Sequence, residues 1–124
     1  MLLMKKELGM VIATCRKQRL LKQDYMAYKL GITTHAYANI ERGRSDICSE
    51  KLFALSNIFG LKMHQLILLA EEIIDVGKTE WLDDVVKGII RISGTGYHHA
   101  LTPEDKFLFA MTKAVVKPLS AIPD

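Results

Sequence analysis

The side chains best suited to chemistry lie in one short stretch of the sequence, residues 23–44. Four of them fall at spacings that place them on one face of a helix: Thr34, His35, Ala38 and Asn39. This face carries hydrogen-bonding groups and no carboxylate or ammonium, and two cations, Arg42 and Arg44, follow it closely. Donors, acceptors and nearby positive charge are typical of a surface that recognises a polar, anionic partner.

The other candidates for chemistry are isolated in the sequence. His98 and His99 are adjacent and have no cysteine or carboxylate at the spacing of metal ligands, so they do not predict a metal site. Cys15 lies on the apolar face of a predicted helix and Cys48 in a predicted loop, so we expect reduced thiols rather than a disulfide framework. No nucleophile–base set can be placed. We therefore expect no enzyme, no metal and no cofactor.

The elements that must position these residues are all predicted to be helices. Apolar residues recur at three- and four-residue spacings, and no stretch shows sustained alternation. The predicted fold class is therefore all-α. The expected helices cover about residues 4–20, a short segment that ends at Leu30, 34–42, 50–59, 63–75, 80–92, and a last segment that starts at Thr102 and stops before Pro118.

Particular residues predict where several of these helices begin and end. Thr33, Ser49 and Thr79 are expected N-caps, because their hydroxyl oxygens can accept a hydrogen bond from a free backbone N–H. Gly31 is expected to end a helix, since glycine adopts the left-handed conformation at low cost. Residues 93–96, Ser-Gly-Thr-Gly, are expected to break the helix before them.

Gly31 also belongs to a pattern that two short crossed helices need. The small Ala27 falls where one helix passes closely over the other, and Met26, Leu30 and Ile40 are spaced to hold the two arms together. The sequence therefore predicts a helix-turn-helix. Its second arm would present the uncharged hydrogen-bonding face to the edges of bases.

At these residues the chain resembles the Xre family of helix-turn-helix regulators, the Cro and lambda-repressor type. The resemblance covers about residues 8–70 and implies a five-helix lambda-repressor-like domain whose third helix enters the major groove of double-stranded DNA. It is carried by an ordered set of short segments: Leu8-Gly9, Ile12, Arg16, Gln23 to Ala27, Leu30 to Thr33, Ile40 to Arg44, Leu52, Leu55, Phe59 to Leu61, and Leu66.

The resemblance also implies roles for individual residues. Those expected to contact bases are Thr34, His35, Ala38 and Asn39. Those expected to contact phosphates are Gln23, Thr33, Arg42, Arg44 and Lys22. Arg16 and Glu41 match a structural ion pair that joins the first helix to the third. The alternative for the polar and basic residues is an ordinary solvated position on a helix surface.

Three positions depart from the family pattern. Lys22 replaces the usual hydroxyl cap of the second helix, which leaves that helix without the cap. Leu20 replaces the glycine that commonly ends the first helix, so this helix would be longer or would exit in another direction. Tyr37 replaces an aliphatic residue, and its hydroxyl group needs a hydrogen-bond partner.

The charge of the chain is divided unevenly along its length. The formal net charge is +3, but residues 1–70 hold 11 Lys and Arg against 5 Asp and Glu, a net charge of +6. Residues 71–124 hold 6 against 9, a net charge of −3. We expect a DNA-binding domain at residues 1–76 and a C-terminal region at residues 77–124 that binds protein.

The C-terminal region is expected to form a two-helix hairpin through which the chain dimerises. Its element order loosely resembles the helical-hairpin tails of SinR-like regulators, and its apolar residues would leave a large exposed patch on a monomer. The expected interface residues are Trp81, Val85, Val86, Ile89, Ile90, Phe107, Leu108 and Met111. The alternative is that these helices fold back on the first domain and complete its core.

These features together predict a sequence-specific transcription regulator, most simply a repressor that binds a palindromic operator as a homodimer. One alternative is an antitoxin that binds DNA through the same domain and its toxin, a second protein, through the C-terminal region. Another is an interaction adaptor without DNA binding. We expect a cytoplasmic, nucleoid-associated chain, because the longest apolar run, Leu66 to Ala70, is too short to span a membrane.

Overall fold

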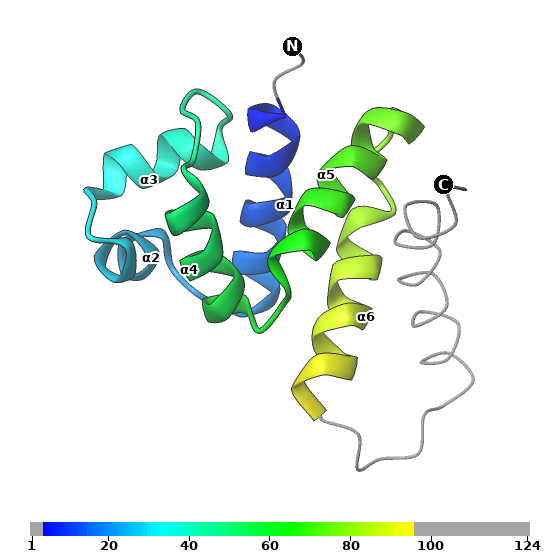
Figure 1. Ribbon diagram of the computed structural model, residues 1–124. Helices are drawn as coiled ribbons and strands as arrows, with labels where there is room; N and C mark the ends of the chain where they lie inside the picture. Colours follow the sequence, from blue (N-terminus) through cyan, green and yellow to red (C-terminus); the bar gives the residue numbers. More distant parts are fainter. Residues whose placement is uncertain (1–3, 96–124) are drawn as a thin grey trace, which may run out of the picture.

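The computed structural model describes residues 4–95, which form helices and their connecting loops and contain no strand. The all-α fold class is therefore confirmed for this part of the chain. The helices are α1 Lys5–Gln18, α2 Gln23–Leu30, α3 Thr34–Glu41, α4 Ser49–Phe59, α5 Met63–Val76 and α6 Leu82–Thr95 (Figure 1). The helix expected after Thr102 lies outside the described residues.

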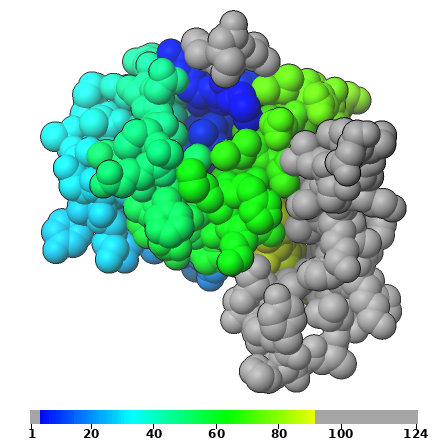
Figure 2. Space-filling model, viewed as in Figure 1, coloured from blue at the N-terminus to red at the C-terminus, as the bar shows by residue number. Residues whose placement is uncertain are grey.

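α1 is the central helix of the fold. It packs against α3 and α4 on one side and against α5 and α6 on the other, while α2 packs against α3 and α4 (Figure 1). In the space-filling view, α2 and α3 form one flank of the surface and α5 lies toward the opposite flank (Figure 2). The helix-turn-helix, which consists of α2 and α3, therefore packs against α1 and α4.

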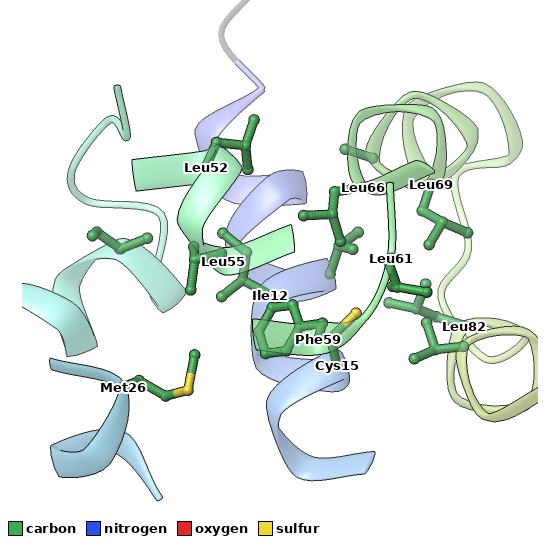
Figure 3. Close-up of a cluster of buried hydrophobic side chains, with 14 of the residues drawn as sticks. Ile12, Cys15, Met26, Leu52, Leu55, Phe59, Leu61, Leu66, Leu69 and Leu82 are labelled. Carbon is green, nitrogen blue, oxygen red and sulfur yellow. The ribbon is translucent and has the colours of Figure 1, made fainter. Parts of the chain in front are cut away.

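The hydrophobic core lies where α1 meets its neighbours. Its largest fully buried apolar side chains come from six helices (Figure 3): Val11, Ile12, Cys15, Met26, Tyr37, Leu55, Phe59, Leu66, Leu69 and Val86. Each fully buried aliphatic or aromatic side chain contributes about 1.5–3 kcal/mol relative to an exposed one. Burial also raises the pKa of the Cys15 thiol to about 12, so this cysteine is a core residue, as expected, and not a thiolate.

α6 belongs to the same core. Leu82, Val85, Val86 and Ile89 are buried in one cluster with residues of α1 and α5. The prediction that Val85, Val86 and Ile89 form a dimer surface is therefore wrong, because packing within the chain already removes these side chains from solvent. For α6, the structure agrees with the alternative that this segment completes the core.

The remaining predicted interface residues have different positions. Trp81 and Ile90 are partly buried and pack against the edge of the core cluster. Phe107, Leu108 and Met111 lie outside the described residues. The expected boundary between residues 76 and 77 falls in the loop between α5 and α6, and the helix that follows this loop packs on α1.

The predicted helix ends are partly correct. Thr33 caps α3 as expected, since its hydroxyl accepts a 3.0 Å hydrogen bond from the Ala36 N–H. Ser49 is instead the first residue of α4, which has no side-chain cap, and Thr79 lies before α6, where its carbonyl accepts from the Leu82 N–H. The expected break at Ser93 is wrong, because α6 continues to Thr95.

No single helix among residues 4–95 is long and apolar enough to cross a membrane. α4 and α5 taken together are long and apolar enough, but the chain bends by 100° between them.

Leu20 has a backbone conformation that leucine rarely adopts. Its φ is 58°, in the left-handed region, and its side chain is 90% exposed. α1 ends at Gln18, so the possible lengthening of this helix does not occur and the chain instead turns at Leu20. A left-handed conformation costs an L-residue about 1–2 kcal/mol, and an exposed leucine gains no burial in return.

Replacing Leu20 with glycine is expected to raise the free energy of unfolding by about 0.5–1 kcal/mol, because the relief of strain exceeds the entropy that glycine loses on folding. Gly31→Ala is the matched control. Gly31 has a φ of 69°, and no atom lies within 4 Å of an added Cβ, so the substitution adds strain without a clash. The free energy of unfolding of this variant should fall by about 1 kcal/mol. Urea unfolding measures both. A Leu20→Gly variant less stable than the wild type would contradict this account.

Candidate nucleic-acid interface

The turn between α2 and α3 has the geometry of a helix-turn-helix. Gly31 ends α2 with a left-handed φ of 69°, and the Ile32 N–H reaches back to the Ala27 carbonyl at 3.0 Å. Ala27 is only 2% exposed, which agrees with a close crossing of the two helices. Met26 from α2 and Tyr37 from α3 are both fully buried in the core.

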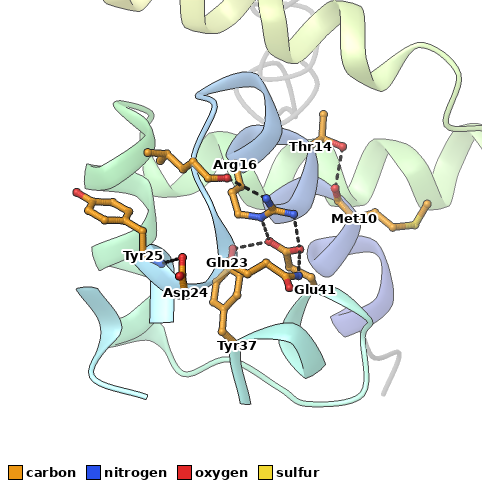
Figure 4. A network of polar contacts seen from close by, with 9 residues as sticks. Met10, Thr14, Arg16, Gln23, Asp24, Tyr25, Tyr37 and Glu41 are labelled. Atoms are coloured by element: carbon orange, nitrogen blue, oxygen red, sulfur yellow. Dashed lines mark hydrogen bonds and ion pairs between the residues drawn. The ribbon is translucent and has the colours of Figure 1, made fainter. Parts of the chain in front are cut away.

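The carboxylate of Glu41 accepts four hydrogen bonds at the centre of this unit (Figure 4). Arg16 donates from Nε to Oε2 at 2.6 Å and from Nη2 to Oε1 at 3.1 Å. Gln23 Nε2 donates to Oε1 at 2.9 Å, and the Tyr37 hydroxyl donates to Oε2 at 2.5 Å. Arg16 Nη1 also donates to the Leu21 carbonyl. One carboxylate therefore joins α1, α2 and α3, and it supplies the partner that the Tyr37 hydroxyl needs.

The protonation states of this network follow from its contacts. Burial by itself would raise the pKa of Glu41, but hydrogen bonds from Arg16, Tyr37 and Gln23 outweigh burial and lower it. Burial, together with the hydrogen bond to Glu41, raises the pKa of Tyr37. Glu41 is thus an anion and Tyr37 a neutral donor at neutral pH. The predicted Arg16–Glu41 pair is present, with side chains only 13% and 6% exposed.

The outer face of α3 carries three of the four residues predicted to contact bases. Thr34 and His35 are exposed, and Asn39 is partly buried with its Nδ2 atom 3.4 Å from His35 Nε2. Ala38 is only 6% exposed, so little of its methyl group is available for the expected base contact. The Oδ1 atom of Asn39 is buried and has no hydrogen-bond partner among the described residues.

The residues predicted to contact phosphates lie around both ends of α3. Arg42 and Arg44 are exposed in the turn that follows the helix. Lys22 is exposed at the start of α2 and makes no cap hydrogen bond, as its departure from the family pattern predicted. Gln23 uses one amide N–H internally on Glu41, so only its second N–H is available to a phosphate. Thr33 is exposed, and its oxygen is engaged as the cap.

Arg19 is a structural residue that the sequence reasoning missed. Its Nε and Nη2 atoms both donate to the Phe59 carbonyl, at 3.0 and 2.7 Å, and so cap the end of α4. A methyl group on Gly60 would lie 2.6 Å from Arg19 Nη2. The only sequence signal was Gly60 itself, which marks a helix end whose carbonyls need partners.

No cluster of three or more His, Cys, Asp or Glu side chains with the geometry of a metal site occurs in the described part of the chain. Cys48 is exposed at the start of α4. The paired histidines, His98 and His99, lie outside the described residues.

Comparison with known proteins gives the same fold. The crystal structure of the clp gene regulator ClgR from Corynebacterium glutamicum is similar, with a TM-score of 0.58 and 18% sequence identity over 61% of this chain and 81% of that chain. At this identity the likeness shows the fold alone. No curated protein matches the chain significantly. The model of the HTH_3 family, described as helix-turn-helix, matches residues 12–66. Residues 12–66 therefore match the helix-turn-helix domain of the HTH_3 family, which is of the Xre and Cro type.

Proposed function

We propose that the chain is a sequence-specific transcription regulator that binds duplex DNA with α3 in the major groove. The observation that carries the proposal is the outer face of α3, where hydrogen-bonding side chains are available to a partner and are followed by Arg42 and Arg44. The family match supports DNA binding, since a helix-turn-helix places its second helix in the groove.

The base-reading residues in this proposal are Thr34, His35 and Asn39. Asn39 carries the largest share, because an asparagine amide can pair with adenine through two hydrogen bonds. Its buried Oδ1 atom supports this role: an unpaired amide oxygen costs about 1–3 kcal/mol, and rotating the amide toward a base would satisfy it. His35 lies one helical turn away and contacts the same amide.

The phosphate-binding residues in this proposal lie on either side of that face. Thr33 is at the N-terminal end of α3, and Arg42 and Arg44 follow its C-terminal end. Gln23, which follows Lys22, reaches the C-terminal end through its hydrogen bond to Glu41. Contacts of this kind position a recognition helix without reading sequence. The Glu41 network supports them, because it holds Gln23 and α3 in a fixed relation to α1.

We further propose that the chain acts as a repressor and binds a palindromic operator as a homodimer. A recognition helix of eight residues reads only a few base pairs, and two copies related by a two-fold axis would double the site. The dimer surface must lie outside Val85, Val86 and Ile89, which are buried. Occupying the operator would then block transcription.

Substitutions at a base-contacting residue and at a phosphate-contacting residue are expected to have different signatures. Asn39→Ala should remove about 1–3 kcal/mol of discrimination at one base position, because only that position loses its paired contact. Arg42→Ala should weaken binding to every sequence and reduce the slope of log affinity against log salt by about 0.9, since one phosphate contact is lost. Titration of labelled duplexes that differ at single positions, over a range of salt, measures both.

Lys87→Ala is the matched control, because Lys87 is exposed on α6, across α1 from α3 (Figure 1). This variant should bind as the wild type does. If Asn39→Ala and Arg42→Ala also bind as the wild type does, α3 does not lie in the groove.

A further inference from the structure

The first turn of α1 packs directly on the turn that follows α3. Gly43 in that turn has a φ of 75°, and a Cβ atom added to it would lie 2.5 Å from Lys6 Cα and 3.1 Å from Lys6 Cβ. Two segments separated by almost forty residues in the sequence therefore meet at one corner of the molecule (Figure 1). In Figure 2 this corner includes the deep-blue start of α1 at the upper edge of the surface.

This contact gathers positive charge at the corner. Arg42 and Arg44 flank Gly43 and are exposed, and Lys6 on the facing helix is exposed as well. None of these three cations forms an ion pair with another residue in the described part of the chain. The carboxylates nearest in sequence are Glu7, Glu41 and Asp46, and Glu41 is already paired with Arg16, so the three cations outnumber the two remaining carboxylates.

The backbone adds to the same electrostatic potential. α1 begins at Lys5, and the residue at its cap position, Met4, makes no side-chain hydrogen bond to the first turn. The positive end of the α1 dipole therefore lies beside the cations of the corner. The combination favours a compact anion and not an apolar or cationic partner.

We propose that Lys6 joins Arg42 and Arg44 in one binding site for a phosphate group of the DNA backbone. The inference rests on the proposed function, because α3 must approach the duplex for this corner to reach it. The two arginines supply planar, forked donors and Lys6 supplies a flexible point charge from another helix. α1 would thereby contact the DNA directly, whereas the family resemblance assigns it only the structural pair through Arg16.

The site also affects how α3 is held on the duplex. Thr33 lies at the N-terminal end of α3, and the Lys6 corner lies at its C-terminal end. With phosphate contacts at both ends, the helix would be held in one orientation along the groove. Loss of Lys6 should then weaken specific and non-specific complexes equally, because a phosphate contact carries no sequence information.

The test is the salt dependence of duplex binding by Lys6→Gln, with Lys87→Gln on α6 as the matched control. Lys6→Gln is expected to reduce the slope of log affinity against log salt by about 0.9, and so to make the drop in affinity between about 50 and 200 mM salt about threefold smaller. Lys87→Gln should keep the wild-type slope. Urea unfolding checks that Lys6→Gln is folded, and its midpoint should match that of the wild type, since Lys6 is exposed.

The outcomes separate this site from the proposed function. If the wild type and Arg42→Ala show the expected salt dependence but Lys6→Gln keeps the wild-type slope, the Lys6 site is overturned and DNA binding by α3 stands. A loss of affinity confined to one base sequence would also overturn it, because that would be base readout. If the wild type shows no salt-dependent binding to any duplex, the proposed function itself fails, and the Lys6 site fails with it.

Discussion

Replacing Glu41 with glutamine is expected to lower the free energy of unfolding by about 3–5 kcal/mol, the cost of leaving one charge of a buried ion pair without its partner. The Arg16 side chain is only 13% exposed and would lose both of its bonds to an anion. Gln23 and Tyr37 would lose their charged acceptor at the same time. The substitution therefore acts on α1, α2 and α3 together. Urea unfolding at neutral pH measures the loss.

The same variant should change the acid sensitivity of the protein in a defined direction. The folded state lowers the pKa of Glu41, so its contribution is fully present above the unfolded pKa, about 4.3, and is lost as the pH falls through the folded value. The difference in stability between the wild type and Glu41→Gln should therefore stay constant from pH 7 to about 5 and shrink in more acidic solution.

Glu71→Gln is the matched control for this prediction, because Glu71 is an exposed carboxylate on α5. Its loss should change stability by less than about 0.5 kcal/mol. A Glu41→Gln variant that loses less than about 1 kcal/mol, or a loss that does not depend on pH, would show that the network is not a buried ion pair in solution.

Replacing Gly9 with alanine is expected to destabilise the fold by about 2–3 kcal/mol, near the upper end of the usual cost of overpacking. An added Cβ atom would lie 2.5 Å from the Ile40 carbonyl oxygen and 2.6 Å from the Glu41 carbonyl oxygen. Both are backbone atoms at the C-terminal end of α3, so no side chain can rotate to make room. The greater helix propensity of alanine, about 1 kcal/mol, offsets only part of this cost.

The consequence of Gly9→Ala should extend to DNA binding, since α3 must move away from α1 to admit the methyl group. Lys17→Ala, an exposed position on the same helix, should leave stability within about 0.5 kcal/mol of the wild type. Thermal unfolding and duplex titration test both expectations. If Gly9→Ala is as stable as the wild type, α1 and α3 are not in the close contact described.

Local sequence signals predicted the helix-turn-helix well, because its geometry depends on short-range rules. Gly31 ends α2 in the left-handed conformation and Thr33 caps α3, as their residue types predicted. The Arg16–Glu41 pair was implied by family resemblance, and the structure contains it. The need of Tyr37 for a partner was predicted from its hydroxyl, although the identity of that partner was not.

The failures concern contacts between elements distant in the sequence. The periodicity of Val85, Val86 and Ile89 shows that α6 has an apolar face, but not whether that face meets the same chain or a second copy. In the same way, helical spacing placed Ala38 on the outer face of α3, while its burial depends on its surroundings in the fold. The contacts of Gly9 with α3 and of Arg19 with α4 also depend on tertiary packing, and no local signal assigned them.

Whether α3 reads DNA sequence can be decided by selecting bound duplexes from a random pool with the wild type and with Asn39→Ala. We expect the wild type to recover one preferred sequence, arranged as two inverted half-sites about one helical turn apart. Asn39→Ala should recover the same site with the preference relaxed at one position in each half-site. Recovery of no preferred sequence by the wild type, or of an identical site by both proteins, would contradict sequence reading by α3.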